Sequence, residues 1–523
     1  MSMINVSNLT FAYDSSYDNI FENVSFQIDT DWKLGFIGRN GRGKTTFLNL
    51  LLGRYDYSGN INASVDFEYF PYSVDNPDTM TLSIVEDILP DIEMWQIFRE
   101  LNLLDTDPEI LYRPFSTLSN GERTKVLLAA LFLKENAFLL IDEPTNHLDA
   151  SARERVAQYL SSKKGFILVS HDRVFLDRCI DHVLSINRAD IEVCKGNFSS
   201  WYTDKEALDK MELARNEHLK QDIRRLEVSA RQSIRWSDKI ESTKTGTRVA
   251  GLRPDRGHIG HQAAKMMKRA KSIQSRQAQA IQEKEKLLKN VETMDDLKLN
   301  QMKYHSHMLV SLKDISVGYI SASSTAQTFT HTDPLQKSSV LDMENLESNN
   351  IHTVCSNISF EIHKGDRICL SGKNGCGKSS LLKLILGENT PSYSGELHIG
   401  SGLQISYVSQ ETSHLNGALS DFAIQNGLDE TVFYSVLRKL GFERVQFEKQ
   451  IDEYSEGQKK KVLLAKSLCE PAHLFLWDEP LNFIDVFSRM QIEELLLEYQ
   501  PTMLFVEHDL AFQEKIATKI ITI

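Results

Sequence analysis

Two kinds of hydrophobic pattern divide this chain. Near residues 138–141, 167–169, 474–477 and 504–506 the apolar residues run without interruption and end at charged or small polar residues, a pattern typical of buried strands. Between residues 201 and 300 the apolar residues instead recur at intervals of three and four, which predicts helices. The two ends of the chain are therefore expected to contain strands, and the middle to be helical.

The central helical pattern is interrupted once. Its apolar face continues to Ile234, glycines and Pro254 then break it, and a near-heptad seam resumes from Ala263 to Leu287. These features predict an antiparallel helical hairpin over residues 201–300. At about 1.5 Å per residue, a helix of about 40 residues would reach roughly 60 Å, so we expect the hairpin to contact a distant target.

Length and composition indicate an ordinary globular protein with more than one domain. The chain has 523 residues, of which 41% are hydrophobic and 25% charged, and its class is expected to be α/β. Equivalent motifs in the two ends are separated by 334 to 337 residues, which indicates two homologous domains in tandem. We expect a first domain at 1–200, the hairpin at 201–300, and a second domain at 301–523 with a polar surface insertion at about 321–350.

Charge is distributed unevenly along the chain. The net charge is −13, yet residues 231–276 contain twelve Lys or Arg and only three Asp or Glu. A basic tip on an acidic protein is typical of contact with a phosphate backbone, so we expect RNA as its target. The alternative is a solvated charged helix face without a partner.

Other classes of protein are disfavoured by the sequence. The apolar run at 126–133 ends at Lys134, far short of the roughly 20 residues that a membrane span needs. The first residues lack a basic and then apolar leader, so a cytoplasmic location is expected. The six cysteines are scattered without C-x-x-C spacing, which argues against a metal site, an iron–sulfur cluster or a disulfide framework.

Each domain contains a phosphate-binding loop of the form G-x-x-x-x-G-K-[ST], beginning at Gly38 and at Gly372. Glycines in such a loop let backbone N–H groups surround phosphates, the lysine reaches the terminal phosphates, and the hydroxyl holds Mg²⁺. Two nucleotide sites are therefore predicted, with ATP and Mg²⁺ as ligands. The predicted loop residues are Gly38, Asn40, Gly41, Gly43, Lys44, Thr45 and Thr46 in the first copy, and Gly372, Asn374, Gly375, Gly377, Lys378, Ser379 and Ser380 in the second.

Three further elements follow each loop in the same order. A serine and a glycine precede a helix that opens with basic residues, and free N–H groups there can bind a phosphate. An apolar strand then ends in two acids, the first suited to Mg²⁺ and the second to polarising the attacking water. A histidine ends another strand, where it can contact the terminal phosphate. The residues are Ser119, Gly121, Asp142, Glu143 and His171 in the first copy, and Ser455, Gly457, Asp478, Glu479 and His508 in the second.

The repeated order of these elements resembles that of ATP-binding-cassette (ABC) ATPases with two fused cassettes. This resemblance implies a head-to-tail arrangement in which the phosphate loop of one cassette shares ATP with the Ser-x-Gly element of the other. Site one would then combine Lys44 and Glu143 with Ser455, and site two Lys378 and Glu479 with Ser119. The resemblance also implies adenine stacking by Tyr13 and Tyr319, Mg²⁺ contacts by Thr45, Asp142, Ser379, Gln410 and Asp478, and interface loops at 146–149 and 482–485.

Further motifs resemble the ABC-F translation factors. These are the segment 170–177 (SHDRVFLD), the segment 196–198 (GNF) before the hairpin, and the segment 264–269 (AKMMKR) on its far side. The resemblance implies binding to the bacterial ribosome at the exit site, with the hairpin directed at the peptidyl-transferase centre. We expect one chain to form an intramolecular cassette pair. The residues expected at the RNA-binding tip are Lys244, Arg248, Arg253, Arg256, Lys265, Lys268 and Arg269.

Departures within the family favour its antibiotic-resistance branch. Tyr72 stands where the second copy has Gln410, so site one is expected to hydrolyse ATP differently or slowly. A short segment before each Ser-x-Gly element, a long hairpin and the form VEHD at 506–509 also resemble proteins that protect ribosomes from lincosamides, pleuromutilins and streptogramin A. The alternatives are a housekeeping translation factor that relieves stalled ribosomes and the ATPase subunit of a membrane exporter.

Overall fold

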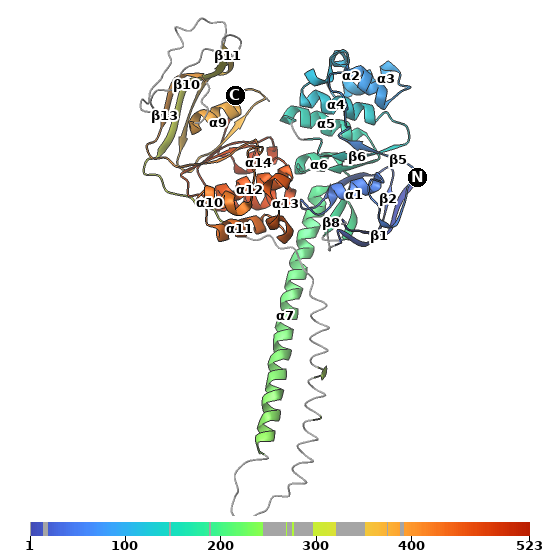
Figure 1. Ribbon diagram of the computed structural model, residues 1–523, viewed down its shortest axis with the longest axis vertical. Coiled ribbons are helices and arrows are strands. Elements are labelled where there is room, and N and C mark those ends of the chain that lie inside the picture. The colour runs from blue at the N-terminus through green and yellow to red at the C-terminus, as the bar shows by residue number, and fades with distance from the viewer. Residues whose placement is uncertain are drawn as a thin grey trace, which may run out of the picture. The chain divides into compact units, whose positions relative to one another are not determined.

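The computed structural model describes residues 2–13, 19–145, 148–187, 190–243, 268, 275–276, 297–320, 351–373, 375–387 and 392–523. The chain forms two compact units. One contains residues Met1–Ser199 and Met294–Ile523, and the other contains Ser200–Thr293. Within the first unit we call the part before residue 200 cassette one and the part after residue 293 cassette two (Figure 1).

Cassette one contains two sheets. A small antiparallel sheet has the order β2-β1-β4, and a larger one has the order β5-β6-β7-β3-β8-β9, in which only β9 runs antiparallel to its neighbour. Long apolar strands at the centre are expected of a parallel sheet covered on both faces. The strands are β1 (Met3–Phe11), β2 (Phe21–Asp29), β3 (Lys33–Ile37), β4 (Ser58–Asn62), β5 (Asp66–Phe70), β6 (Ala137–Asp142), β7 (Phe166–Val169), β8 (His182–Asn187) and β9 (Asp190–Lys195).

The helices of cassette one connect these strands or form a separate helical region. Helices α2 and α3 both pack on α4, away from the β1–β2 sheet (Figure 1). Their buried faces carry apolar side chains such as Ile84, Ile97 and Val126. The helices are α1 (Lys44–Leu51), α2 (Thr81–Ile88), α3 (Met94–Leu103), the 3-10 turns η1 (Pro108–Tyr112) and η2 (Phe115–Thr117), α4 (Asn120–Leu131), α5 (Ala150–Ser162) and α6 (Arg173–Cys179).

Cassette two repeats this topology. Its small sheet has the order β11-β10-β13, and its parallel sheet has the order β14-β15-β16-β12-β17, which matches β5-β6-β7-β3-β8 strand for strand. The predicted α/β class and tandem repeat are thus confirmed. The strands are β10 (Met308–Ile320), β11 (Ile351–His363), β12 (Arg367–Ser371), β13 (Ser392–Ile399), β14 (Ile405–Val408), β15 (Leu474–Asp478), β16 (Met503–Val506) and β17 (Lys519–Thr522).

The helices of cassette two occupy the equivalent places. The predicted insertion at 321–350 falls between β10 and β11 and lies outside the described residues. The helices are α9 (Lys378–Leu386), α10 (Leu419–Gln425), α11 (Glu430–Lys439), the 3-10 turns η4 (Arg444–Glu448) and η5 (Ile451–Glu453), α12 (Glu456–Cys469), α13 (Val486–Tyr499) and α14 (Leu510–Ile516).

The predicted hairpin is described only in its first half. Helix α7 (Phe198–Thr243) has 46 residues, which corresponds to roughly 69 Å, and it begins slightly before the expected start at residue 201. On the far side only Lys268, Ser275 and Arg276 are described, so the returning helix stays a prediction. None of the helices in the described ranges combines the length and apolar character that crossing a membrane requires.

Replacing Leu476 by Ala tests the core of cassette two. Leu476 is fully buried in β15, so the loss should be about 2–5 kcal/mol, whereas Leu497→Ala on the partly exposed face of α13 should cost much less. Hydrogen exchange of the amides in β15 and β16 would measure the free energy of opening in each variant. Equal losses in the two variants would contradict the assigned core.

Candidate functional site

Both phosphate loops join the end of a parallel strand to the start of a helix. The loop before α1 ends at Gly43 with a φ of 91°, and the loop before α9 ends at Gly377 with a φ of 95°. These are left-handed conformations that side chains disfavour. A Cβ at Gly43 would also lie 2.6 Å from Ile20 Cγ2, so glycine is required there for two reasons. The result is a free helix N-terminus that faces the loop, as anion binding needs.

The lysine of each loop donates to carbonyls of its own loop. Lys44 Nζ donates to Gly38 O at 2.7 Å, and Lys378 Nζ donates to Gly372 O at 2.9 Å. Both side chains are buried, and burial lowers the pKa of Lys44. Each ammonium group is thus held at the place where the motif predicts terminal phosphates. A bound phosphate would place negative charge beside Lys44 and would oppose the lowering of its pKa by burial.

The tyrosines expected beside adenine lie next to these helices. The Tyr13 hydroxyl is 2.9 Å from Thr46 Oγ1, and the Tyr319 hydroxyl is 2.7 Å from Ser380 Oγ. Both tyrosines remain partly exposed, at 37% and 44%. Each therefore has ring surface available beside the loop, as stacking on a base requires.

The first acid of each pair lies beside the loop hydroxyl as predicted from the motif. Thr45 Oγ1 donates to Asp142 Oδ2 at 3.2 Å, and Tyr69 donates to the same oxygen at 3.0 Å. Burial raises the pKa of Asp142, and it raises the pKa of Asp478 to about 6. Within the described residues neither buried oxygen of Asp478 accepts a hydrogen bond of normal geometry.

This donor set fits Mg²⁺. The ion prefers oxygen ligands, and each site offers a hydroxyl and a carboxylate that is buried enough to gain from a cation. Thr45 with Asp142 would hold it in site one, and Ser379 with Asp478 in site two. Bound Mg²⁺ would neutralise phosphate charge as a Lewis acid.

The second acid of each pair lies against the predicted histidine. His171 Nε2 is 3.3 Å from Glu143 Oε1, and His508 Nε2 is 3.5 Å from Glu479 Oε1. Both glutamates have left-handed backbones, with φ of 50° and 46°. Such a backbone conformation is uncommon in a non-glycine residue. Its occurrence at equivalent positions of both copies is typical of a functional site.

The two glutamates differ in their electrostatic environment. Burial raises the pKa of Glu143 to about 8. Burial would also raise the pKa of Glu479, but hydrogen bonds and charge from His508 and a hydrogen bond from Gln410 outweigh it and lower the pKa. The Gln410 Nε2 donates to Glu479 Oε2 at 2.8 Å. Site one has Tyr72 at the position of Gln410, so the carboxylate there lacks this amide.

The Ser-x-Gly elements cap helices α4 and α12. Ser119 Oγ accepts from the Glu122 N–H at 3.2 Å, and Ser455 Oγ accepts from the Gln458 N–H at 3.3 Å. In both helices the side chain at the third position bonds back to the serine N–H, which completes a capping box. The serines are therefore held at exposed helix N-termini.

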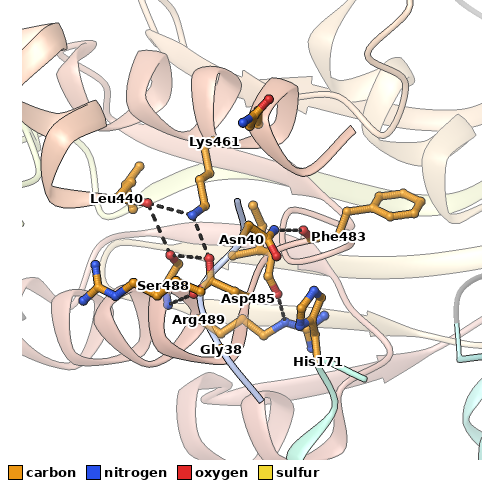
Figure 2. A network of polar contacts seen from close by, with 12 residues as sticks. Gly38, Asn40, His171, Leu440, Lys461, Phe483, Asp485, Ser488 and Arg489 are labelled. Carbon is orange, nitrogen blue, oxygen red and sulfur yellow. Dashed lines mark hydrogen bonds and ion pairs between the residues drawn. The ribbon is translucent and has the colours of Figure 1, made fainter. Parts of the chain in front are cut away.

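The two halves of site one are in direct contact (Figure 2). Asn40 Nδ2 donates to Phe483 O at 2.7 Å, so the phosphate loop of cassette one touches the interface loop of cassette two. A Cβ at Gly457 would lie 2.4 Å from Phe483 O and 2.7 Å from Asn40 Nδ2. Only glycine fits there, so the close packing at this contact explains why the Ser-x-Gly element has a glycine at position 457.

A buried ion pair lies behind this contact. Lys461 Nζ donates to Asp485 Oδ2 and to Leu440 O, each at 2.7 Å, and both charged side chains are almost inaccessible (Figure 2). Burial alone would raise the pKa of Asp485, but the charges of Lys461 and Lys44 hold it far below its ordinary value. Asp485 thus places negative charge close to the phosphate-loop lysine.

The two halves of site two surround a cavity of about 880 Å³. This volume is sufficient for a nucleotide-sized ligand. The lining includes residues from both cassettes, among them Ser119, Gly121, Gly375, Gly377, Lys378, Ser379, Ser380, Gln410, Glu479 and His508. The residues that the head-to-tail arrangement predicts for site two therefore line this cavity together.

Some predicted residues lie outside the described part of the chain. These are Asn374, the first two residues of the interface loop at 146–149, and the tip residues Lys244, Arg248, Arg253, Arg256, Lys265 and Arg269. Lys268 is described and exposed. Sequence reasoning missed Tyr69, whose only signal was its position in an apolar strand, and the pairing of Lys461 with Asp485, which joins two motifs that were considered separately.

The fold and the paired sites define a protein with twin ATP-binding cassettes. The family model described as ABC transporter matches residues 21–146 and 355–482, so the chain contains two ABC-type domains, which bind ATP.

Curated relatives match almost the whole chain. ATP-binding protein Uup of Buchnera aphidicola is 26% identical, covering 99% of this chain and 80% of its own length. Ribosome protection protein VmlR of Bacillus subtilis is 26% identical, covering 96% and 84% respectively. Energy-dependent translational throttle protein EttA of Escherichia coli is 25% identical, covering 96% and 89%.

Solved structures share the fold. The archaeal ribosome recycling factor aABCE1, in complex with the ribosomal stalk protein aP1, matches with a TM-score of 0.57 and 17% identity, covering 98% of this chain and 87% of the other. At this identity the likeness shows the fold alone.

Replacing Asp485 by Asn tests the buried ion pair. Lys461 would lose its partner, so the variant should lose about 3–5 kcal/mol at pH 7. Because the folded pKa of Asp485 is depressed, its contribution is complete above the unfolded value of about 4 and is lost as the pH falls below it. Urea unfolding at pH 7, 5 and 3.5 should show a constant and then a shrinking difference from wild type.

The control for this prediction is Glu448→Gln, which removes an exposed pair with Arg444 on the surface of cassette two. A small loss is expected because exposed pairs contribute little. A pH-independent difference for Asp485→Asn would contradict the depressed pKa.

Proposed function

We propose that this chain is an ABC-F-type ATPase that binds the bacterial ribosome in its ATP-bound form. The observation that carries the proposal is the cavity of site two, where the phosphate loop of one cassette faces the Ser-x-Gly element of the other. A ligand with several phosphates would bind both halves at once. Similarity over 96% of the chain to a ribosome protection protein and to a translational throttle protein supports the ribosome as the target.

ATP binding would draw the two cassettes together. Lys378 and the N–H groups of its loop would bind the phosphates from one side, and Ser119 at the N-terminus of α4 would bind the terminal phosphate from the other. Closure by a ligand follows from its contacts with both halves, which only the closed form provides. The closed form would then be the one that binds the ribosome.

Hydrolysis would end the bound state. Glu479, whose pKa is lowered by His508 and Gln410, would orient and polarise the attacking water, while Lys378 would neutralise phosphate charge. Glu143 and His171 would perform the same roles in site one. The raised pKa of Glu143 and the absence of a Gln410 equivalent favour slower turnover there.

The finer proposal is ribosome protection against antibiotics. The hairpin at 201–300, with its basic tip, would reach from the exit site towards the peptidyl-transferase centre and displace lincosamides, pleuromutilins or streptogramin A. Similarity to VmlR and the departure at Tyr72 support this branch. The second candidate is a housekeeping factor that relieves stalled ribosomes, which similarity to EttA favours equally.

The first test uses the double variant Glu143→Gln, Glu479→Gln. Loss of both carboxylates should preserve ATP binding but block hydrolysis, so the closed form should accumulate. We expect strong co-sedimentation with bacterial ribosomes in ATP and little without it. The control, Lys44→Met with Lys378→Met, should not co-sediment in either condition. Failure of the glutamine variant to bind ribosomes with ATP would overturn the ribosome proposal.

The second test separates resistance from housekeeping. In a susceptible bacterial strain, expression of the chain should raise the minimal inhibitory concentration of at least one of the three drug classes. The Lys44→Met, Lys378→Met variant should not produce this increase. The measurement is the minimal inhibitory concentration beside an unrelated ribosomal drug. Unchanged susceptibility to all three classes, with intact ribosome binding, would favour the housekeeping function.

A further inference from the structure

Two cations around the buried carboxylate of Glu493 join the two cassettes away from the phosphate loops. Arg173 Nη2, at the start of α6 in cassette one, contacts Glu493 Oε1 in α13 of cassette two. The other oxygen of Glu493 accepts from Lys515 Nζ of α14 at 3.0 Å. Glu493 is completely buried, and Arg173 and Lys515 each contact one of its oxygens. We call Arg173, Glu493 and Lys515 the ionic joint.

The ionic joint connects residues that belong to site one. Arg173 stands two residues after His171, which contacts Glu143. Helix α13, which carries Glu493, begins directly after Asp485, whose charge acts on Lys44. The joint therefore links the histidine of site one in cassette one with the interface loop of site one in cassette two.

The equivalent positions on the side of site two are apolar. Leu510 stands two residues after His508, as Arg173 does after His171. Ala157 stands eight residues after Asp149, as Glu493 does after Asp485. Leu510 and Ala157 line one small cavity of about 30 Å³, together with His508. The two residues equivalent to the cross-cassette pair Arg173 and Glu493 are thus apolar, although the same cavity is also lined by Arg178 and Glu154, which pair within cassette one.

One neighbouring charge pair is repeated in both copies. Arg153 lies 3.4 Å from Asp172, and the equivalent Arg489 lies 3.2 Å from Asp509. Each arginine also donates to a carbonyl of its own interface loop, Leu148 O or Ile484 O. These pairs lie within single cassettes and hold each histidine segment to its interface loop.

We propose that the ionic joint keeps the two halves of site one together while site two opens and closes to exchange nucleotide. The proposal rests on the ATP-driven closure proposed above and adds which site exchanges faster. Opening site one would separate the buried carboxylate of Glu493 from Arg173 and leave both incompletely paired. Opening site two would break no ion pair at the equivalent positions, Leu510 and Ala157. The contact of Asn40 with Phe483 in site one and the cavity in site two agree with this difference.

The test measures release of a fluorescent, non-hydrolysable ATP analogue from single-site variants of the whole chain. The Lys378→Met variant should bind the analogue in site one alone, and the Lys44→Met variant should bind it in site two alone. Adding Arg173→Leu should speed release from site one by about tenfold or more, the scale of one lost charge-assisted contact, and leave site two within about twofold. Arg173→Lys, which keeps the cation, should fall between wild type and Arg173→Leu.

Two further variants make the test specific. Lys313→Leu removes an exposed pair with Glu396 in the small sheet of cassette two and should leave release from both sites unchanged. Leu510→Arg with Ala157→Glu would place an ion pair on the side of site two and should slow release from that site. Thermal unfolding of each variant checks the fold, and Arg173→Lys supplies the answer if Arg173→Leu does not fold.

The outcomes separate the joint from the proposed function. Equal acceleration of both sites by Arg173→Leu and Arg173→Lys, or no acceleration of either, would overturn the joint. Because no ribosome is present, that result would leave ribosome binding untouched. Absence of nucleotide binding by both single-site variants would overturn ATP use by the chain, and the joint with it.

Discussion

Asp485 carries a negative charge that has no access to solvent, and the contact between the cassettes at site one depends on how that charge is compensated. Lys461 compensates it through a direct contact, and Lys44 of the facing cassette adds a second positive charge. Burial lowers the pKa of Lys44, and the charge of Asp485 opposes that lowering. The charges of Asp485 in the interface loop, Lys461 in helix α12 and Lys44 after the phosphate loop therefore interact with one another. These three segments come from different parts of the sequence.

The same constraint explains why the two ATP sites are not equivalent. The repeat gives both cassettes the same loops and acids, but charge compensation differs at Tyr72 against Gln410 and at Arg173 against Leu510. Glu479 accepts a hydrogen bond from Gln410, whose place in cassette one is taken by Tyr72, and the pKa values of Glu479 and Glu143 shift in opposite directions. A duplicated chain can thus keep its fold while substitutions at few positions change the charges around one site and not around the other.

Local patterns were sufficient to predict much of the fold and the ATP motifs. Continuous apolar runs predicted β6, β7, β15 and β16, and the G-x-x-x-x-G-K-[ST] motif predicted both loops, because these features depend on neighbouring residues. The pairing of Lys461 with Asp485 could not be predicted, since it depends on how α12 packs beside the start of α13. Tyr69 was missed for a related reason: a tyrosine in a strand is unremarkable until its hydroxyl is seen on Asp142.

The contact of Arg173 with Glu493 shows what a repeat reveals once its copies are compared in space. In the sequence, Arg173 is one basic residue at the start of a short helix, and Glu493 is one acid in a helix whose other acids are mostly exposed. The sequence repeat places Leu510 and Ala157 at the corresponding positions, but only the fold shows that Arg173 and Glu493 meet across the cassettes. A buried carboxylate is unfavourable without its cations, so we infer that Glu493 is kept here for its pairing with Arg173 across the cassettes. Pairing that favours one of two otherwise similar sites is what a two-site ATPase needs if its sites are to act in a fixed order.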